Sequence, residues 1–147
     1  MRAIVQRVGS ARVLVDSQTV GEIGQGLLIF LGICRSDGPR EAEWLAHKIL
    51  HLRIFPDGQG RMNLSVKDVW GDLLIVSQFT LYGETKKGNR PSFAEAASPE
   101  RARPLYDYFT ELCGRSSLKV QTGTFQAHMR VELSNDGPVT LLCETES

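Results

Sequence analysis

The run Ser77-Gln78-Phe79-Thr80 stands where an apolar stretch, Leu73–Val76, ends. A strand that stops hydrogen bonding at this point leaves backbone N–H groups without partners. Such groups can stabilise the oxyanion of a tetrahedral ester intermediate, and the loss of one donor costs about 3–4 kcal/mol in the transition state. We expect Phe79 to pack inward, opposite Gln78 and Thr80, and Thr80 Oγ1 to hold the ester or a water. A hydroxyl without a nearby base is a poor nucleophile, so the run favours catalysis by positioning. An ordinary polar strand end is the alternative.

A second segment, Asn135–Thr140, places Gly137-Pro138 between two strand-like stretches. By itself the pair indicates a tight turn, and only about 5–6% of X-Pro bonds in folded proteins are cis. A bent backbone at this point can also present bare peptide groups to a ligand, because glycine has no side chain. The residues alone leave both interpretations open.

Other catalytic groups lack their usual neighbours in the sequence. His47 and His51 have a metal-capable i, i+4 spacing, but Lys48 stands where a zinc protease carries glutamate. No third ligand is evident, so a solvated helix face is the simpler interpretation. His128 has no serine or cysteine beside it, although a triad assembled in space remains open. Phosphate-binding glycine motifs are missing from the sequence.

Hydrophobic periodicity predicts the elements that position these residues. We expect strands over 3–8, 11–15, 26–31, 73–76, 127–133 and 139–143, with turns at 16–18 and 56–60. Helices are expected to begin at Asp37-Gly38-Pro39 and at Ser98-Pro99-Glu100, since proline is tolerated in a first helical turn and serine is a good N-cap. Their apolar stripes are Ala42, Leu45, Ile49 and Leu52, and then Ala102, Leu105, Tyr106, Phe109, Leu112 and Cys113. The sequence therefore predicts one strand-rich α+β domain over residues 1–147, with two main helices and a curled or barrel-like sheet completed by dimerisation.

Composition restricts the class of protein. Of the 147 residues, 41% are hydrophobic and 23% charged, as in an ordinary soluble globule. Seventeen basic and 17 acidic residues give a formal net charge of +0, whereas a protein that coats nucleic acid is usually more basic. An RNA ligand must then be held by a local patch and by its end.

The three cysteines, Cys34, Cys113 and Cys143, lie far apart and form neither a disulfide framework nor a CxxC metal site. Buried thiols in a reducing cytoplasm are the simplest interpretation. The sequence has no cationic-then-apolar leader, and no apolar run approaches the ~18 residues of a membrane span. We therefore expect a cytoplasmic protein without membrane contact.

Four segments together resemble the signature of D-aminoacyl-tRNA deacylases, enzymes that remove wrongly attached D-amino acids from tRNA. These segments are Met1–Val8, Ser77–Leu81, Asn89–Phe93 and Asn135–Thr140. The likeness extends to about Cys143 without a large gap. It implies hydrolysis of the ester at the 3′-terminal ribose, without a metal or organic cofactor. Ser77, Gln78, Phe79 and Thr80 would position the carbonyl and its developing oxyanion.

The resemblance also implies a chiral filter. Gly137-Pro138 is expected to be cis and to enter the active site of the partner subunit in a homodimer. Its carbonyls would occupy the space that an L side chain needs. Glycine would not be excluded, so glycyl-tRNA mischarged on tRNA-Ala is an expected second substrate. Phe125 and Met129 are implied near the terminal adenosine or the aminoacyl group, although spacing alone favours a core position for Met129.

Three cations, Lys86, Lys87 and Arg90, follow in the polar loop 83–90. A solvated charged loop is their ordinary interpretation. The functional alternative is phosphate contact with the single-stranded CCA end of aminoacyl-tRNA, where each neutralised phosphate contributes a salt slope of about −0.7. No DNA partner is expected.

Two rival functions remain open. A non-catalytic RNA-binding module would hold the tRNA end in the same pocket, although the chain has few basic residues for it. The second rival is an editing hydrolase that acts on L-aminoacyl-tRNA. The residues around Gly137-Pro138 count against this hypothesis.

Overall fold

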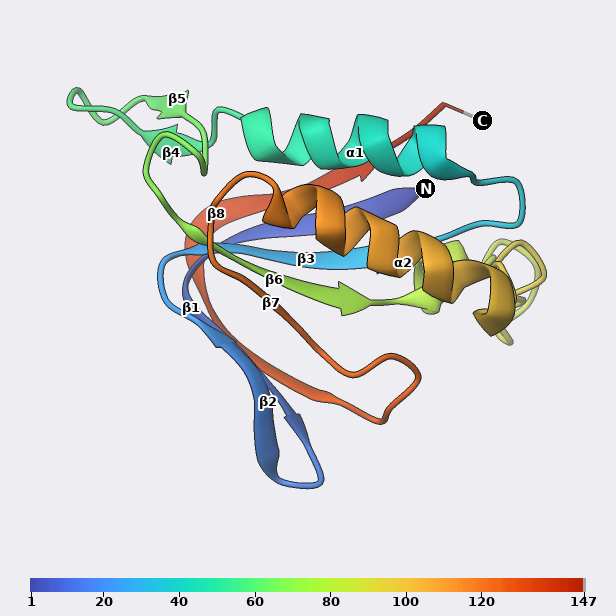
Figure 1. Cartoon of the computed structure of the whole chain (residues 1–147). Coiled ribbons are helices and arrows are strands. Elements are labelled where there is room, and N and C mark those ends of the chain that lie inside the picture. Colours follow the sequence, from blue (N-terminus) through green and yellow to red (C-terminus); the bar gives the residue numbers. More distant parts are fainter. Residues whose placement is uncertain (147) are drawn as a thin grey trace.

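The structure, a computed structural model, describes residues 1–146. Its main sheet has the order β2-β1-β3-β6-β7, and β8 pairs with β1 outside this path. Two α-helices, α1 (Pro39–His51) and α2 (Pro99–Gly114), lie side by side across one face of the sheet (Figure 1). The strands are β1 Arg2–Val15, β2 Gln18–Ile23, β3 Gly26–Gly32, β4 Phe55–Pro56, β5 Met62–Leu64, β6 Asp72–Ser77, β7 Val120–Thr122 and β8 Arg130–Glu144. The predicted strand-rich α+β fold with two main helices is confirmed.

Strand β1 organises the sheet because three other strands pair with it. Its first half pairs with β3 and its second half with β2, while the long strand β8 runs antiparallel along β1 from end to end. The sequence predicts two strands over 3–8 and 11–15. The structure has one, because the chain passes Gly9 through an irregularity in the β1–β8 ladder instead of turning back.

The sheet curls until β2 contacts both β6 and β7. This close approach depends on Gly21 in β2. An added Cβ there would overlap the carbonyl oxygen of Thr122 and lie 3.2 Å from Leu74 Cδ1. The expected barrel-like curl is confirmed, while its completion by dimerisation stays a prediction.

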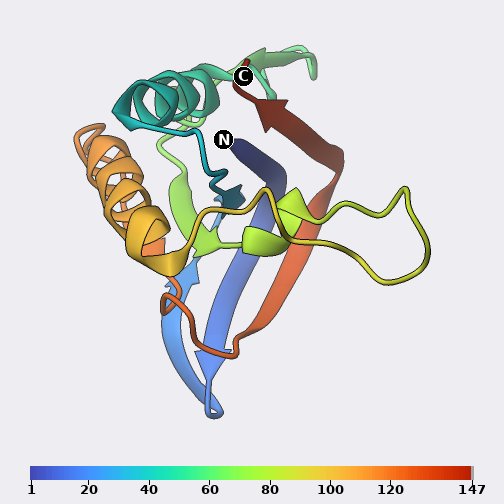
Figure 2. The ribbon, with the colours of Figure 1, turned by 90° about the vertical axis from the view of Figure 1, so that its right-hand side faces the viewer.

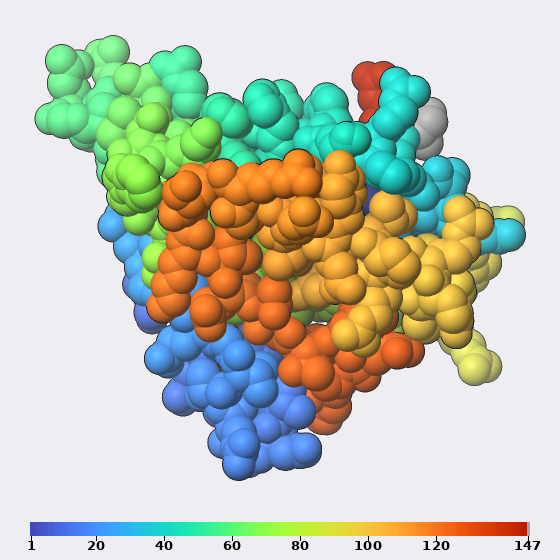
Figure 3. Space-filling model, viewed as in Figure 1, coloured from blue at the N-terminus to red at the C-terminus, as the bar shows by residue number. Residues whose placement is uncertain are grey.

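Two apolar clusters occupy the two faces of the central strands. One lies between the sheet and the helices and includes Leu27, Ile29, Leu31, Leu45, Ile49, Leu73, Ile75, Tyr106 and Phe109. The other fills the inside of the curl and includes Val8, Ala11, Val13, Ile23, Leu28, Leu74 and Val76. Strands β3 and β6 are buried on both faces and pair in parallel, so their sequences are unbroken apolar runs rather than alternating ones. Figure 3 shows α1 and α2 covering one face, with the β1–β2 hairpin projecting beyond them.

The helix predictions are confirmed in place, with small differences at the ends. Ser98 is the N-cap of α2 but its side chain makes no capping hydrogen bond, and Leu52 lies just beyond α1 as its C-cap. The sequence does not predict β4, β5 and β7, because two or three residues are too few to show a period. It does not predict the six-residue strand β2 either, because one of its two buried positions is Gly21 and the apolar alternation is missing. The strand predicted over 127–133 begins only at Arg130.

All three cysteines are free thiols, and only Cys113 is fully buried, where desolvation raises its pKa to about 12. Within residues 1–146, no helix has the length and apolar character needed to cross a membrane.

Replacing Gly21 with alanine tests the closure of the sheet. Because the new methyl group meets the backbone of Thr122, we expect the free energy of unfolding to fall by about 1–3 kcal/mol. Gly9→Ala is the matched control in the neighbouring strand, since an added Cβ there meets nothing within 4 Å. Urea denaturation of both variants measures the difference, and equal stabilities would contradict the packing described at Gly21.

Candidate active site

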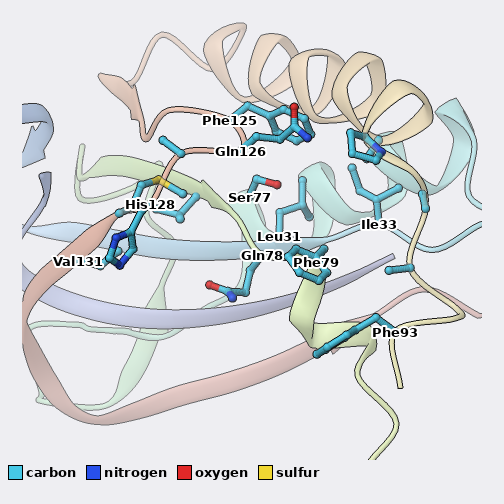
Figure 4. A pocket seen from close by; sticks show the side chains of 17 residues that line it. Leu31, Ile33, Ser77, Gln78, Phe79, Phe93, Phe125, Gln126, His128 and Val131 are labelled. Atoms are coloured by element: carbon cyan, nitrogen blue, oxygen red, sulfur yellow. The ribbon is translucent and has the colours of Figure 1, made fainter. Parts of the chain in front are cut away.

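A cavity of about 550 Å³ opens where the parallel strands β3 and β6 end, beneath the first turns of α2 (Figure 4). Crevices at the carboxyl ends of parallel strands are common ligand sites. The lining residues are Leu31, Ile33, Val76, Ser77, Gln78, Phe79, Phe93, Ala96, Ala97, Pro99, Ala102, Phe125, Gln126, Ala127, His128, Met129 and Val131. Of the predicted site residues, Ser77, Gln78, Phe79, Phe125 and Met129 come together here.

The sequence predicts free backbone N–H groups at the end of β6, but the N–H of Gln78 is paired. The N–H of Gln78 donates to the carbonyl of Leu31 at 2.8 Å and prolongs the β3–β6 ladder. The chain then enters the 3₁₀-helix η1 (Phe79–Tyr82), whose first N–H groups have no acceptor within the turn. Among residues 1–146, the N–H groups of Phe79 and Thr80 donate to no other atom. The free donors at the strand end are therefore those of Phe79 and Thr80.

The prediction that Phe79 packs inward is wrong. Its side chain is 56% exposed and stands edge-to-face with Phe93, with ring centroids 5.3 Å apart. Because Phe79 begins a 3₁₀ turn, the two-fold alternation of a strand no longer applies to it. The amide of Gln78 donates to Thr80 Oγ1, so the hydroxyl is engaged within the same turn. Phe93, for which the sequence predicts no role, lines the cavity beside Phe79.

A segment after β7 provides the opposite side of the cavity. Phe125 lies between Tyr106, at 5.7 Å between ring centroids, and the guanidinium of Arg103, at 5.4 Å from its ring. The hydroxyl of Tyr106 donates to the Ile75 carbonyl at 2.8 Å, which ties α2 to β6 directly below the cavity. Gln126 follows in the left-handed region with φ 66°, and its side chain lines the rim.

The candidate histidines do not form a conventional catalytic or metal site. Ser77 and His128 both line the cavity, but no hydrogen bond joins them among residues 1–146. His47 and His51 stack on α1, with ring centroids 4.2 Å apart, and His51 Nδ1 lies 2.7 Å from the carbonyl oxygen of His47. In the same described part of the chain, no three His, Cys, Asp or Glu side chains are placed to hold a metal.

Gly137-Pro138 lies away from this cavity, on the exposed middle of β8, and its peptide bond is cis. The predicted turn between two strands is instead a bulge within one strand. Asn135 pairs with Val8 and Thr140 pairs with Gln6, so residues 136–139 all stand opposite Arg7. The bulge pushes the Gly-Pro pair out of the ladder while both flanks continue along β1.

Arg7 anchors this bulge from below. Its guanidinium donates to the Asp136 carbonyl at 3.1 Å and to the Ile54 carbonyl at 2.6 Å, and it pairs with the Asp136 carboxylate at 3.1 Å. The Asn135 amide donates to the carbonyls of Arg7 at 2.9 Å and Val139 at 3.1 Å. The sequence does not predict this role. The available signal was a cation in the inward register of Ala3 and Val5.

The three predicted phosphate-binding cations do not line the cavity. Lys86, Lys87 and Arg90 are exposed on the segment 83–91, which leaves η1 and projects from the body of the protein (Figure 2). A bridge between Glu84 and Ser92 closes the base of this loop. Their charges are therefore adjacent to η1 in sequence but separate from the cavity itself.

Comparisons with known proteins identify the family of this fold and site. The family model described as D-Tyr-tRNA(Tyr) deacylase matches residues 4–144. A D-aminoacyl-tRNA deacylase of Thermotoga petrophila is 55% identical over 145 residues, covering 99% of this chain and 97% of the relative. One from Carboxydothermus hydrogenoformans is 54% identical over 144 residues, covering 98% of this chain and 99% of the relative.

Two solved structures share the fold. The c-Myc DNA Unwinding Element Binding Protein superposes with a TM-score of 0.94 at 40% identity, covering 100% of both chains. A probable eukaryotic D-amino acid tRNA deacylase superposes with a TM-score of 0.85 at 19% identity, covering 98% of both chains. The class that the fold and cavity define is thus an α+β protein with a cavity at the ends of two parallel strands. The chain belongs to the D-aminoacyl-tRNA deacylase family.

Arg7→Met tests whether the buried guanidinium holds the bulge. The variant leaves the Ile54 and Asp136 carbonyls without their donor, so we expect the free energy of unfolding to fall by about 1.5–3 kcal/mol. Arg12→Met is the control on the same strand, because Arg12 forms only an exposed pair with Glu132 and its loss costs less than about 1 kcal/mol. Urea denaturation gives both values, and an equally mild effect of the two changes would contradict the anchoring role.

Proposed function

We propose that this chain hydrolyses the ester between a D-amino acid and the 3′-terminal adenosine of tRNA, and that it rejects the L ester. The observation that carries the proposal is the family match across residues 4–144. The reaction releases free D-amino acid and tRNA, which is a chiral proofreading step in translation. We propose that residues 1–147 act as one deacylase unit.

The cavity fits the terminal adenosine. Its volume of about 550 Å³ is in the range of small-molecule pockets, roughly 300–1,000 Å³. Its walls are mainly apolar, and Phe125 and Met129 would pack against the base. Contact of this kind between a base and an aromatic ring contributes about 1–3 kcal/mol.

The free N–H groups of Phe79 and Thr80 supply the chemistry. Water attacks the ester carbonyl, whose oxygen becomes negatively charged and accepts hydrogen bonds from these two donors. The bond to the ribose oxygen then breaks, the proton released by the attacking water passes to that oxygen, and the oxygen leaves as a hydroxyl. Ser77 and Gln78 orient the substrate beside the donors. In this scheme the side chain of Thr80 is not the nucleophile, since a hydroxyl without a neighbouring base is a poor one.

Chiral selection is assigned to Gly137-Pro138 of a second copy of the chain. None of the residues 135–139 lines the cavity of its own chain, so any contribution to this site must come from a neighbour. Strand β8 also exposes apolar side chains that suit burial in a homodimer, namely Leu133, Leu141 and Leu142. The carbonyls of the neighbour would occupy the L side-chain position, and glycyl-tRNA, which lacks a side chain, would still be accepted.

Lys86, Lys87 and Arg90 are proposed to contact phosphates of the tRNA acceptor end. Their loop extends directly from the catalytic turn, so it can follow the RNA as it leaves the cavity (Figure 2). The overall charge of +0 fits a protein that recognises one RNA end rather than a long duplex. The relative named for DNA binding, at 40% identity, makes duplex DNA a useful competitor in binding assays.

Paired hydrolysis assays test the function. With purified protein, we expect D-tyrosyl-tRNA to be lost at least about 100-fold faster than in the spontaneous control, as positioned oxyanion donors allow. Glycyl-tRNA should be cleaved and L-tyrosyl-tRNA spared. Loss of both tyrosyl esters would identify an L-type or general editor, and loss of neither, together with tRNA binding, would identify a binding module.

Mixing two variants tests whether Phe79 and Gly137 act in one site from different copies of the chain. Phe79→Pro removes the Phe79 N–H while Phe79→Ala keeps it, so only the proline variant should lose about 10²–10³ in kcat. Proline is tolerated at the first position of a helical turn, where this N–H has no acceptor. Gly137→Val adds bulk at the exposed bulge and should block the cavity of the neighbour.

Phe79→Pro alone and Gly137→Val alone are each expected to be nearly inactive. A co-expressed mixture should recover about one quarter of wild-type activity, because half of randomly paired dimers are mixed and each has one intact site. If Gly137 acted within its own chain, every site in the mixture would carry a defect. A mixture as inactive as its parents would therefore contradict the assignment to the partner subunit.

A further inference from the structure

Arg103 lies at the rim of the cavity, outside its lining. Its guanidinium is 5.4 Å from the centre of the Phe125 ring, and Phe125 lines the cavity. Two other cation–aromatic contacts occur in residues 1–146, between Arg2 and Tyr82 and between Lys48 and Trp44, and neither aromatic ring lines the cavity. Of the three cations in these contacts, Arg103 is thus the one that stacks on an aromatic side chain lining the cavity.

The cavity itself offers no cation to a phosphate. The polar side chains of its lining are Ser77, Gln78, Gln126 and His128, and no lysine or arginine is among them. A nucleotide whose base enters this cavity carries its phosphate outward, towards the rim. A basic side chain just outside the lining is therefore in position to bind that phosphate.

The ion pair of Arg103 leaves its guanidinium available. Arg103 Nε is 3.9 Å from the nearest carboxylate oxygen of Asp107, beyond hydrogen-bond distance. At the other end of α2, Glu111 and the C-cap residue Arg115 have the same i, i+4 relation and a closer contact of 3.1 Å. The two arginines are almost equally exposed, at 62% and 61% of the side chain, so they differ mainly in their place along α2. Arg103 is near its cavity end and Arg115 follows its last residue.

We propose that Arg103 binds the backbone phosphate that leads to the terminal adenosine of the tRNA substrate. The stack on Phe125 holds the guanidinium in place, so phosphate binding and base packing share one wall of the site. A planar guanidinium suits both tasks, since it stacks on aromatic faces and binds phosphate oxygens through paired donors. The inference rests on the proposed function, because it requires the adenosine to occupy this cavity.

Salt-dependent binding measures this contact directly. The probe is full-length tRNA whose D-tyrosine is joined to the terminal ribose by an amide, which the protein cannot hydrolyse as an ester. We expect Arg103→Met, which keeps much of the packing on Phe125, to reduce the slope of log Kd against log [KCl] by about 0.7. In 0.1 M KCl this corresponds to about five-fold weaker binding. Arg115→Met is the matched control and should behave as wild type.

Two further variants distinguish a phosphate contact from a structural role. Arg103→Lys should retain the salt slope because it keeps the charge. Asp107→Asn should strengthen binding, since it removes the competing carboxylate, whereas Glu111→Gln should not. Because the proposed role of Arg103 is to bind substrate, the loss in Arg103→Met should appear mainly as a higher KM for D-tyrosyl-tRNA and less in kcat.

An Arg103→Met variant with the Kd and salt slope of Arg115→Met would overturn the inference. Unchanged slopes combined with a lower kcat would also overturn it, because they indicate a disturbed cavity. The proposed function fails separately, if the wild-type protein leaves D-tyrosyl-tRNA intact.

Discussion

The parallel pairing of β3 with β6 is the interaction on which the rest of this structure depends. Both strands are buried on both faces, so they support the helices on one side and the inside of the curled sheet on the other. The last bond of their ladder, from Gln78 N–H to the Leu31 carbonyl, fixes the residue at which regular pairing ends. The N–H groups of Phe79 and Thr80 become free because the chain turns into η1 directly after that bond.

A second constraint comes from β1, which holds both flanks of β8 in one continuous ladder. The extra residues opposite Arg7 have no place in that ladder, so they leave it as an outward bulge. Arg7 is only 8% exposed and satisfies carbonyls on the bulge and at Ile54, which makes the position of Gly137-Pro138 a property of the core. A segment that looks like a surface turn is therefore tied to the core by side-chain hydrogen bonds.

Apolar groups, hydrogen-bond donors and cations occupy different places around the site. The cavity is lined mainly by apolar side chains, the N–H groups of Phe79 and Thr80 are free at the strand end beside it, and cations stand outside the lining at Arg103 and on the loop 83–91. This arrangement is compatible with a chain of net charge +0, because few phosphates need to be neutralised when one RNA end is bound. In the proposed function, recognition of the tRNA end and catalysis at its ester therefore use different parts of the same wall.

The sequence by itself determined much of the fold and part of the site. Apolar periodicity located both helices and the buried strands, and the Ser77–Leu81 and Asn135–Thr140 segments marked the family. These features are local, since a period or a motif needs only neighbouring residues. It could not show that β1 is one strand, because the partner that keeps Gly9 in line is β8, more than 100 residues away.

The tertiary structure alone decided which donors are free, that Phe79 faces outward beside Phe93, and that Arg103 stacks on Phe125. Each of these facts depends on contacts between distant segments, which side-chain chemistry permits but does not specify. Arg7 illustrates the difference between what the sequence shows and what only the tertiary structure shows. Its inward register is visible in the sequence, but its acceptors at Asp136 and Ile54 exist only in the folded chain.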